Sequence, residues 1–196
     1  ESLEASYEPN LVPNGMGQIT VAGSGSELAV TGPNALYVGY SGTGLLDVTD
    51  GGSVTAAAVI LGASPESEGG LIIDGGTLSA SSDMVVGAWG EGALMVSDGH
   101  AAMNSLFIGG FDANDAPEGF PEVPGDSNGI GEVTVTGEGS VIEVNAVGAL
   151  HVGYGGQGEL HVLNGGTLTS PDSFIGTTSD GAGWMDVNDG TWVNDG

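Results

Sequence analysis

The sequence predicts an all-β protein, a right-handed parallel β-solenoid (β-helix) of about seven coils with one acidic loop insertion. Three observations predict this fold class. A glycine-flanked block recurs along nearly the whole chain, apolar and polar residues alternate inside each copy, and no segment has helical periodicity. The handedness follows from the general rule for parallel crossovers. A β-sandwich of short hairpins is the alternative, but such a sandwich would not need a fixed coil period.

The repeat is clearest in two long copies, VGYSGTGLLDVTDGGSV at 38–54 and VGYGGQGELHVLNGGTL at 152–168. Residues 17–62 align with residues 131–176 without a gap, and about 20 of these 46 positions are identical. This match indicates an internal duplication. Each coil of some two dozen residues has room for three short strands, whose inward apolar residues stack on those of the next coil.

The first strand of each coil ends at an Asp-Gly or Asn-Gly corner, where a positive φ is needed. Alignment on this corner places five residues in one slot: Asp50, Asp74, Asp98, Asn164 and Asp189. The inward residues two positions earlier are then Val48, Ile72, Val96, Val162 and Val187. Only the copy that contains Gly70 breaks the alternation. The corner carboxylates either attract metal ions as a line or cap their own turns, and Asn164 in the same slot favours capping.

A second strand follows the corner, and a third strand ends each coil just before a glycine. The last residues of these third strands are Val38, Leu61, Val86, Ile108, Val152 and Ile175. The repeats therefore occupy residues 17–196. Residues 1–16 carry no repeat signature, and we expect them to form a cap over the first coil or an arm that pairs with another subunit.

The chain stops after the second strand of a coil, so either the sequence is a fragment or a neighbouring copy completes the stack. We therefore expect assembly contacts at both ends of the solenoid. The candidate residues are Leu3, Tyr7, Leu11, Trp192 and Val193.

The insertion FDANDAPEGFPEVPGDSNG at 111–129 replaces a connection of only a few residues in the other coils. It concentrates carboxylate and amide oxygens, the ligands that hard cations such as Ca²⁺ prefer, on a Pro/Gly-rich loop. The candidate ligands are Asp112, Asn114, Asp115, Glu118 and Asp126. The alternative is an acidic, solvated loop without a metal.

The composition excludes several classes of function. The chain has no Lys, no Arg and no Cys, and its formal net charge is −26. Binding of nucleic acid or of anionic membranes is therefore not expected, and neither are disulfides or thiol catalysis. No apolar run approaches the roughly 20 residues of a membrane span, so we expect no membrane insertion. Since 39% of the residues are apolar, the chain can still build a core.

Catalysis is not expected either. Uronate lyases usually need an Arg or Lys, and carboxylate pairs are too frequent here to identify a glycosidase site. The three histidines, His100, His151 and His161, do not have the spacing of metal ligands. His151 and His161 alternate with inward-facing residues, so we expect both side chains to point toward solvent.

The pattern VGxxGxGxLxVxxGGxV, seen at 38–54 and, with Leu as its last residue, at 152–168, resembles the repeat family shared by autotransporter passengers and PEP-CTERM-type surface proteins. The resemblance covers most of the chain from Gly17 onward. It implies a β-helical stalk and an extracellular or cell-surface location, and no residue of the family pattern is catalytic.

Together these observations favour an extracellular structural protein, a subunit of a cell-surface filament or stalk. We expect it to form a homo-polymer by end-to-end stacking and to be stabilised by cations, Ca²⁺ among them. The alternative is an adhesin passenger that binds a neutral glycan or a surface through an aromatic edge made by Tyr40, Trp89 and Tyr154.

Overall fold

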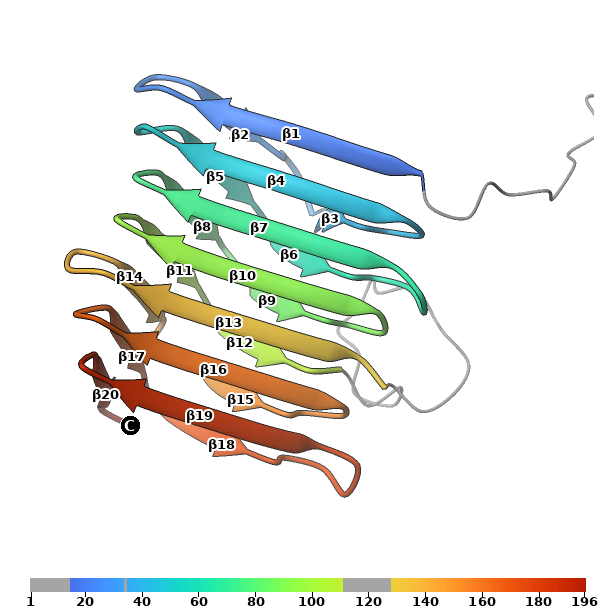
Figure 1. Cartoon of the computed structure of the whole chain (residues 1–196), viewed down its shortest axis with the longest axis vertical. Coiled ribbons are helices and arrows are strands. Elements are labelled where there is room, and N and C mark those ends of the chain that lie inside the picture. Colours follow the sequence, from blue (N-terminus) through green and yellow to red (C-terminus); the bar gives the residue numbers. More distant parts are fainter. Residues whose placement is uncertain (1–14, 34, 111–127) are drawn as a thin grey trace, which may run out of the picture.

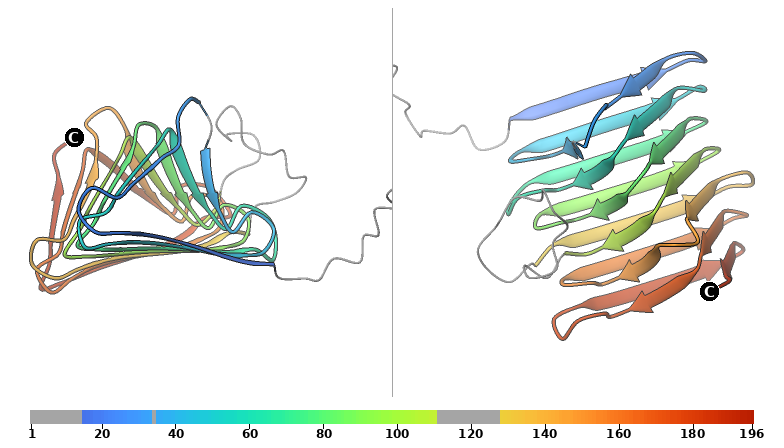
Figure 2. Two further views of the ribbon diagram at one scale, coloured as in Figure 1. Left: turned by 90° about the horizontal axis from the view of Figure 1, so that it is seen from above. Right: turned by 180° about the vertical axis from the view of Figure 1, so that it is seen from behind.

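The chain folds into a right-handed solenoid with three parallel β-sheets as its faces (Figures 1 and 2). The computed structural model describes residues 15–33, 35–110 and 128–196. The predicted all-β parallel solenoid is confirmed, with six complete coils and two strands of a seventh. The described part of the chain contains no helix, and so no helix that is long and apolar enough to cross a membrane.

We call the three faces sheets A, B and C, in the order in which each coil visits them. Sheet A holds the seven-residue strands β1 (Met16–Ala22), β4 (Thr43–Thr49), β7 (Glu68–Asp74), β10 (Glu91–Ser97), β13 (Ile130–Thr136), β16 (Gln157–Leu163) and β19 (Ala182–Asn188). Sheet B holds β2 (Glu27–Ala29), β5 (Ser53–Ala56), β8 (Thr77–Ala80), β11 (His100–Met103), β14 (Val141–Val144), β17 (Thr167–Ser170) and β20 (Thr191–Asn194). Sheet C holds β3 (Ala35–Val38), β6 (Ala58–Leu61), β9 (Asp83–Val86), β12 (Ser105–Ile108), β15 (Ala149–Val152) and β18 (Asp172–Ile175). Coil 1 is therefore β1–β3, and coil 7 is β19 and β20.

In-register pairing arranges the inward side chains in columns that run along the solenoid. One column of sheet A consists of Val21, Val48, Ile73, Val96, Val135, Val162 and Val187. Its five internal members are fully buried, and burial of a Val or Ile side chain contributes about 1.5–3 kcal/mol. Because each coil presents the same position to its neighbours, the columns form one continuous core.

In the third coil, the observed register differs by one residue from the alignment predicted from the sequence. Leu46 pairs with Leu71, so Ile72 and Gly70 face outward rather than inward. The residue in the corner slot is Gly75, with a φ of 71°, and not Asp74. The error has a physical cause. The corner of coil 3 is one residue shorter than that of coil 2, so an alignment on the Asp-Gly-Gly letters shifts the preceding strand.

A column of seven glycines lies where sheet C passes the chain to sheet A. Its members are Gly17, Gly44, Gly69, Gly92, Gly131, Gly158 and Gly183. At all of them except Gly17, an added Cβ would lie within 3.0 Å of backbone atoms. At Gly131, for example, these atoms are the Val86 carbonyl oxygen and the Gly109 nitrogen. The glycines thus allow each sheet A strand to pass close to the backbone of the C-to-A corners beside it. Gly17 is the exception, because nothing lies within 4 Å of its added Cβ.

Candidate functional site

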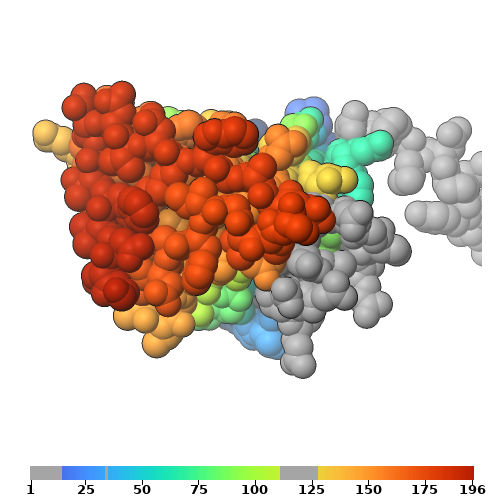
Figure 3. Space-filling view, turned by 90° about the horizontal axis from the view of Figure 1, so that it is seen from below, coloured from blue at the N-terminus to red at the C-terminus, as the bar shows by residue number. Residues whose placement is uncertain are grey.

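The two end faces of the solenoid expose residues that are buried in every internal coil. At the C-terminal end, Ile175 is 50% exposed and Val187 is 43% exposed, whereas Val152 and Val162, their partners one coil earlier, are fully buried. At the other end, Ile19 is 48% exposed and pairs with Leu46, which is 1% exposed. Figure 3 looks onto the C-terminal end, where coil 7 and the last strand of sheet C, β18, form the face. Each face therefore offers apolar core residues beside strand edges.

The structure separates the two assembly residues predicted near the C-terminus. Trp192 points inward and is half-buried, and its Nε1 donates a hydrogen bond to Ser170 Oγ at 3.0 Å. Val193 points outward on sheet B and is 43% exposed, so only its backbone belongs to the end edge. The other predicted assembly residues, Leu3, Tyr7 and Leu11, lie outside the described residues.

The predicted calcium ligands also lie outside the described residues: Asp112, Asn114, Asp115, Glu118 and Asp126. Among the residues that the structure does describe, no group of three or more His, Cys, Asp or Glu could hold a metal ion.

The corner slots do not form an acidic line. The slot residues, all with positive φ, are Gly23, Asp50, Gly75, Asp98, Gly137, Asn164 and Asp189. No two carboxylates occupy adjacent coils in this column. The slot therefore selects residues that tolerate a left-handed backbone, which Gly, Asn and Asp do best.

The three aromatic residues predicted to form a binding edge differ in exposure. Trp89 is only 6% exposed and belongs to a satellite cluster with Ile60 and Val85, so its placement on an exposed edge was wrong. It lies one residue farther from its corner glycine than Tyr40 does, which changes the direction of its side chain. Tyr40 is 50% exposed and contacts Tyr37 edge to face, and Tyr154 is half-buried four coils away. Glycan binding at Tyr40 and Tyr154 stays a prediction.

The structure shows an aromatic stack on the outer face of sheet C that sequence reasoning missed. The His151 ring lies between Phe107 and Phe174, with centroids 4.8 and 4.9 Å away and interplanar angles of 2° and 11°. His151 Nδ1 lies 3.2 Å from Thr177 Oγ1, and partial burial lowers the pKa of His151. The side chain does face outward, as predicted, but its neighbours shield it. The sequence does contain a signal for this stack, since each stacked residue stands two positions before a corner glycine.

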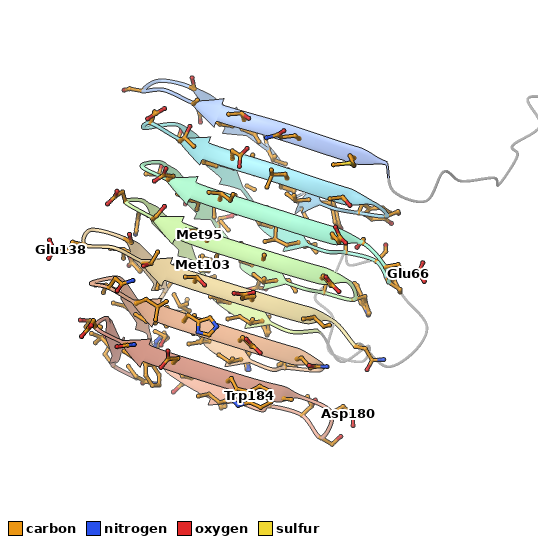
Figure 4. All side chains as sticks on the ribbon, viewed as in Figure 1. Glu66, Met95, Met103, Glu138, Asp180 and Trp184 are labelled. Atoms are coloured by element: carbon orange, nitrogen blue, oxygen red, sulfur yellow. The ribbon has the colours of Figure 1, made fainter. Side chains whose placement is uncertain are left out.

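The outer face of sheet A brings like charges together. Glu68 lies in register with Glu91, and Glu132 lies in register with Glu159, in strands about 4.8 Å apart. Glu68, Glu91 and Glu132 border a hollow of about 670 Å³ whose lining also includes Gly70. The same face exposes large apolar side chains, Met95 and Trp184 (Figure 4). The chain has no Lys or Arg, and the basic side chain beside these acids in the described part of the chain is His161, whose Nε2 lies 3.6 Å from Glu159 Oε2.

Comparison of the chain with family models, with curated proteins and with solved structures finds no match. The resemblance of the repeat to autotransporter and PEP-CTERM-type surface repeats therefore stays a prediction.

Proposed function

We propose that this chain is an extracellular structural protein, a subunit of a cell-surface filament or stalk that assembles head to tail. The observation that carries the proposal is the exposure of core residues on both end faces. Ile19 at one end and Ile175 and Val187 at the other occupy columns whose members in the internal coils are buried. Stacking one end on the other would remove this apolar surface from water and pair the strand edges.

The repeat geometry supports a mechanical role. Backbone ladders run along the solenoid in all three sheets, and the side-chain columns keep one register from β1 to β19. A second copy placed on either end would meet the same type of surface that each coil already meets. Such a heterologous contact does not close on itself, so it would grow into a filament.

The charge distribution supports cation dependence. A net charge of −26 without fixed positive partners makes copies repel each other. In-register pairs such as Glu68 with Glu91 add local repulsion within sheet A. Dissolved cations would screen both effects, and Ca²⁺ would do so more strongly than Na⁺ at equal concentration.

Negative-stain electron microscopy and sedimentation of the full chain test the proposal. The conditions are calcium, calcium followed by a chelator, and a sodium salt at matched ionic strength. We expect long uniform fibres in calcium that shorten after chelation. Short monodisperse rods in all three conditions would overturn assembly, whereas fibres that persist equally in each would overturn the special role of calcium.

A further inference from the structure

We infer that the joint between copies reproduces the internal joint between coils 4 and 5. Gly17 and Ser26 of one copy would then meet Ile175 and Asp189 of the next copy. This inference rests on the proposed head-to-tail assembly and names the contacts that make it.

The edge of coil 1 that faces away from coil 2 has the same features as the edge of coil 5 that faces coil 4. The internal duplication aligns β1 with β13, and both strands lead into a Gly-x-Gly-Ser corner, 23–26 and 137–140. In each corner the serine hydroxyl donates a hydrogen bond to the carbonyl four residues earlier, from Ser26 to Ala22 and from Ser140 to Thr136. The Oγ atom of each serine can therefore still accept a hydrogen bond, and it faces the same way relative to its own coil in both corners.

The edge of coil 7 that faces away from coil 6 has the same features as the edge of coil 4 that faces coil 5. Asp98 and Asp189 occupy the same corner slot with φ values of 46° and 54°, and each is followed by one glycine. In the internal joint, the Asp98 backbone N–H donates to Ser140 Oγ at 2.8 Å, and Ser140 is fully buried. Ser26 in coil 1 is only partly buried. Stacked in the same way, Ser26 Oγ would accept the Asp189 N–H of the neighbouring copy.

The glycine column gives independent support. Gly17 has an open Cβ position, and its φ is not positive, so no contact within the described chain requires a glycine there. At four of its counterparts, Gly69, Gly131, Gly158 and Gly183, a corner carbonyl oxygen lies within 2.5 Å of an added Cβ, whereas at Gly44 and Gly92 the nearest atom is a corner amide nitrogen. At Gly183 that carbonyl belongs to Val152, the column neighbour of Ile175. When coil 1 of one copy stacks on coil 7 of another, the Ile175 carbonyl takes the equivalent place against Gly17.

The internal joint also fixes the register. In it, Val96 pairs with Val135 and Ala101 pairs with Ile142. Transferred to the joint between copies, Val187 pairs with Val21 and Trp192 pairs with Leu28, so the apolar columns continue. On the outer face of sheet A, Asp186 of one copy lies beside Thr20 of the next.

Cysteine cross-linking tests this register directly, because the chain has no cysteine of its own. One preparation carries Thr20→Cys and a second carries Asp186→Cys, and the two are mixed under oxidising conditions. In-register neighbours have a Cα separation that a disulfide spans, so we expect disulfide-linked dimers that form only in the mixture. The control pair, Thr20→Cys with Asn188→Cys, is displaced by two residues, about 7 Å along the strand, and should link at least tenfold less.

Gly17→Ala tests the close approach. We expect this variant to fold as the wild type does and to lose fibres, because its Cβ would collide with the Ile175 carbonyl of the next copy. The control Gly70→Ala places a methyl group on the outer face of sheet A, away from both ends, where its neighbours are the Leu45 side chain at 3.1 Å and the Gly44 carbonyl oxygen at 3.9 Å. It should assemble normally.

The possible outcomes distinguish failure of this joint from failure of head-to-tail assembly itself. Wild-type chains that remain single rods overturn both the assembly and this joint. Fibres that survive Gly17→Ala, or cysteine pairs that link only in the displaced register, overturn the joint and leave head-to-tail assembly standing. Linked dimers together with loss of fibres in Gly17→Ala establish the joint.

Discussion

Coils 1 and 5 carry copies of one sequence in two different environments. Coil 5 lies between coils 4 and 6, whereas coil 1 has a neighbour on one side only within the described chain. The same type of residue therefore differs in what surrounds it: an added Cβ at Gly131 would meet backbone atoms, and one at Gly17 would meet nothing within 4 Å. In a solenoid, the column decides which residue type fits, and the number of neighbouring coils decides how much that residue contributes to stability.

The largest difference is expected between Gly131→Ala and Gly17→Ala in the monomer. The added Cβ at Gly131 would overlap the Val86 carbonyl oxygen, so we expect a loss of about 3 kcal/mol or more in the free energy of unfolding. Gly17→Ala should change it by less than about 1 kcal/mol and can stabilise the fold, because alanine restricts the unfolded chain. Urea unfolding under conditions that prevent assembly measures both. Equal losses would contradict the assignment of Gly17 to an open edge.

A smaller difference is expected between Val162→Ala and Val187→Ala, two members of one inward column. Val162 is fully buried, so losing two methyl groups should lower the free energy of unfolding by about 2 kcal/mol. Val187 is 43% exposed, and its loss should stay below about 1 kcal/mol in the monomer. If the two variants unfold at the same urea concentration, coil 7 is covered in solution by something that the described chain does not provide.

The smallest expected effect is the pH dependence that His151 adds to coil 5, where coil 1 has Tyr37 in the same column. Burial lowers the pKa of His151 in the native state, while the unfolded chain keeps a value of about 6.5. The unfolded state therefore binds the proton more readily, so stability is complete above pH 6.5 and falls as the pH drops toward the native pKa. His151→Phe should remove this part of the pH dependence and keep the stack with Phe107 and Phe174.

The control for this experiment is His151→Tyr, which gives coil 5 the residue type of coil 1 and also removes the titration. Urea unfolding between pH 5 and 8, taken as the difference between wild type and each variant, isolates His151 from the many carboxylates. If the difference does not change with pH, the native imidazole is protonated as easily as the unfolded one.

Much of the fold could be predicted because the geometry of a solenoid follows from a repeat that is local in the sequence. The column of Val48, Val96 and Val162 was identified by alternation alone, and these residues are fully buried. The error at Asp74 arose because a corner can shorten by one residue and keep the same letters. Ladder register, which decides such cases, depends on pairing between coils and not on the corner motif.

The candidate sites were harder to predict than the fold. Inward positions can be predicted from the period of two. The contacts and exposure of an outward side chain depend on its neighbours in adjacent coils. Trp89 was predicted to be exposed because it follows a corner glycine, yet its ring is buried beside Ile60 and Val85. His151 was predicted to face solvent, and the flanking rings of Phe107 and Phe174 became visible only when the coils were stacked.

The order of residues along the chain was enough to predict the parallel solenoid, the duplication and the apolar columns, since each depends on spacing. The tertiary structure decided which corner residue lies above which, which glycines are enclosed, and which outward side chains stack. The physical reason is that strand alternation is a local property of the backbone, whereas contacts between coils join residues about two dozen or more positions apart and follow corner length. Gly17 and Gly131 show the difference, since they occupy equivalent positions of the internal duplication and the fold places different atoms beside them.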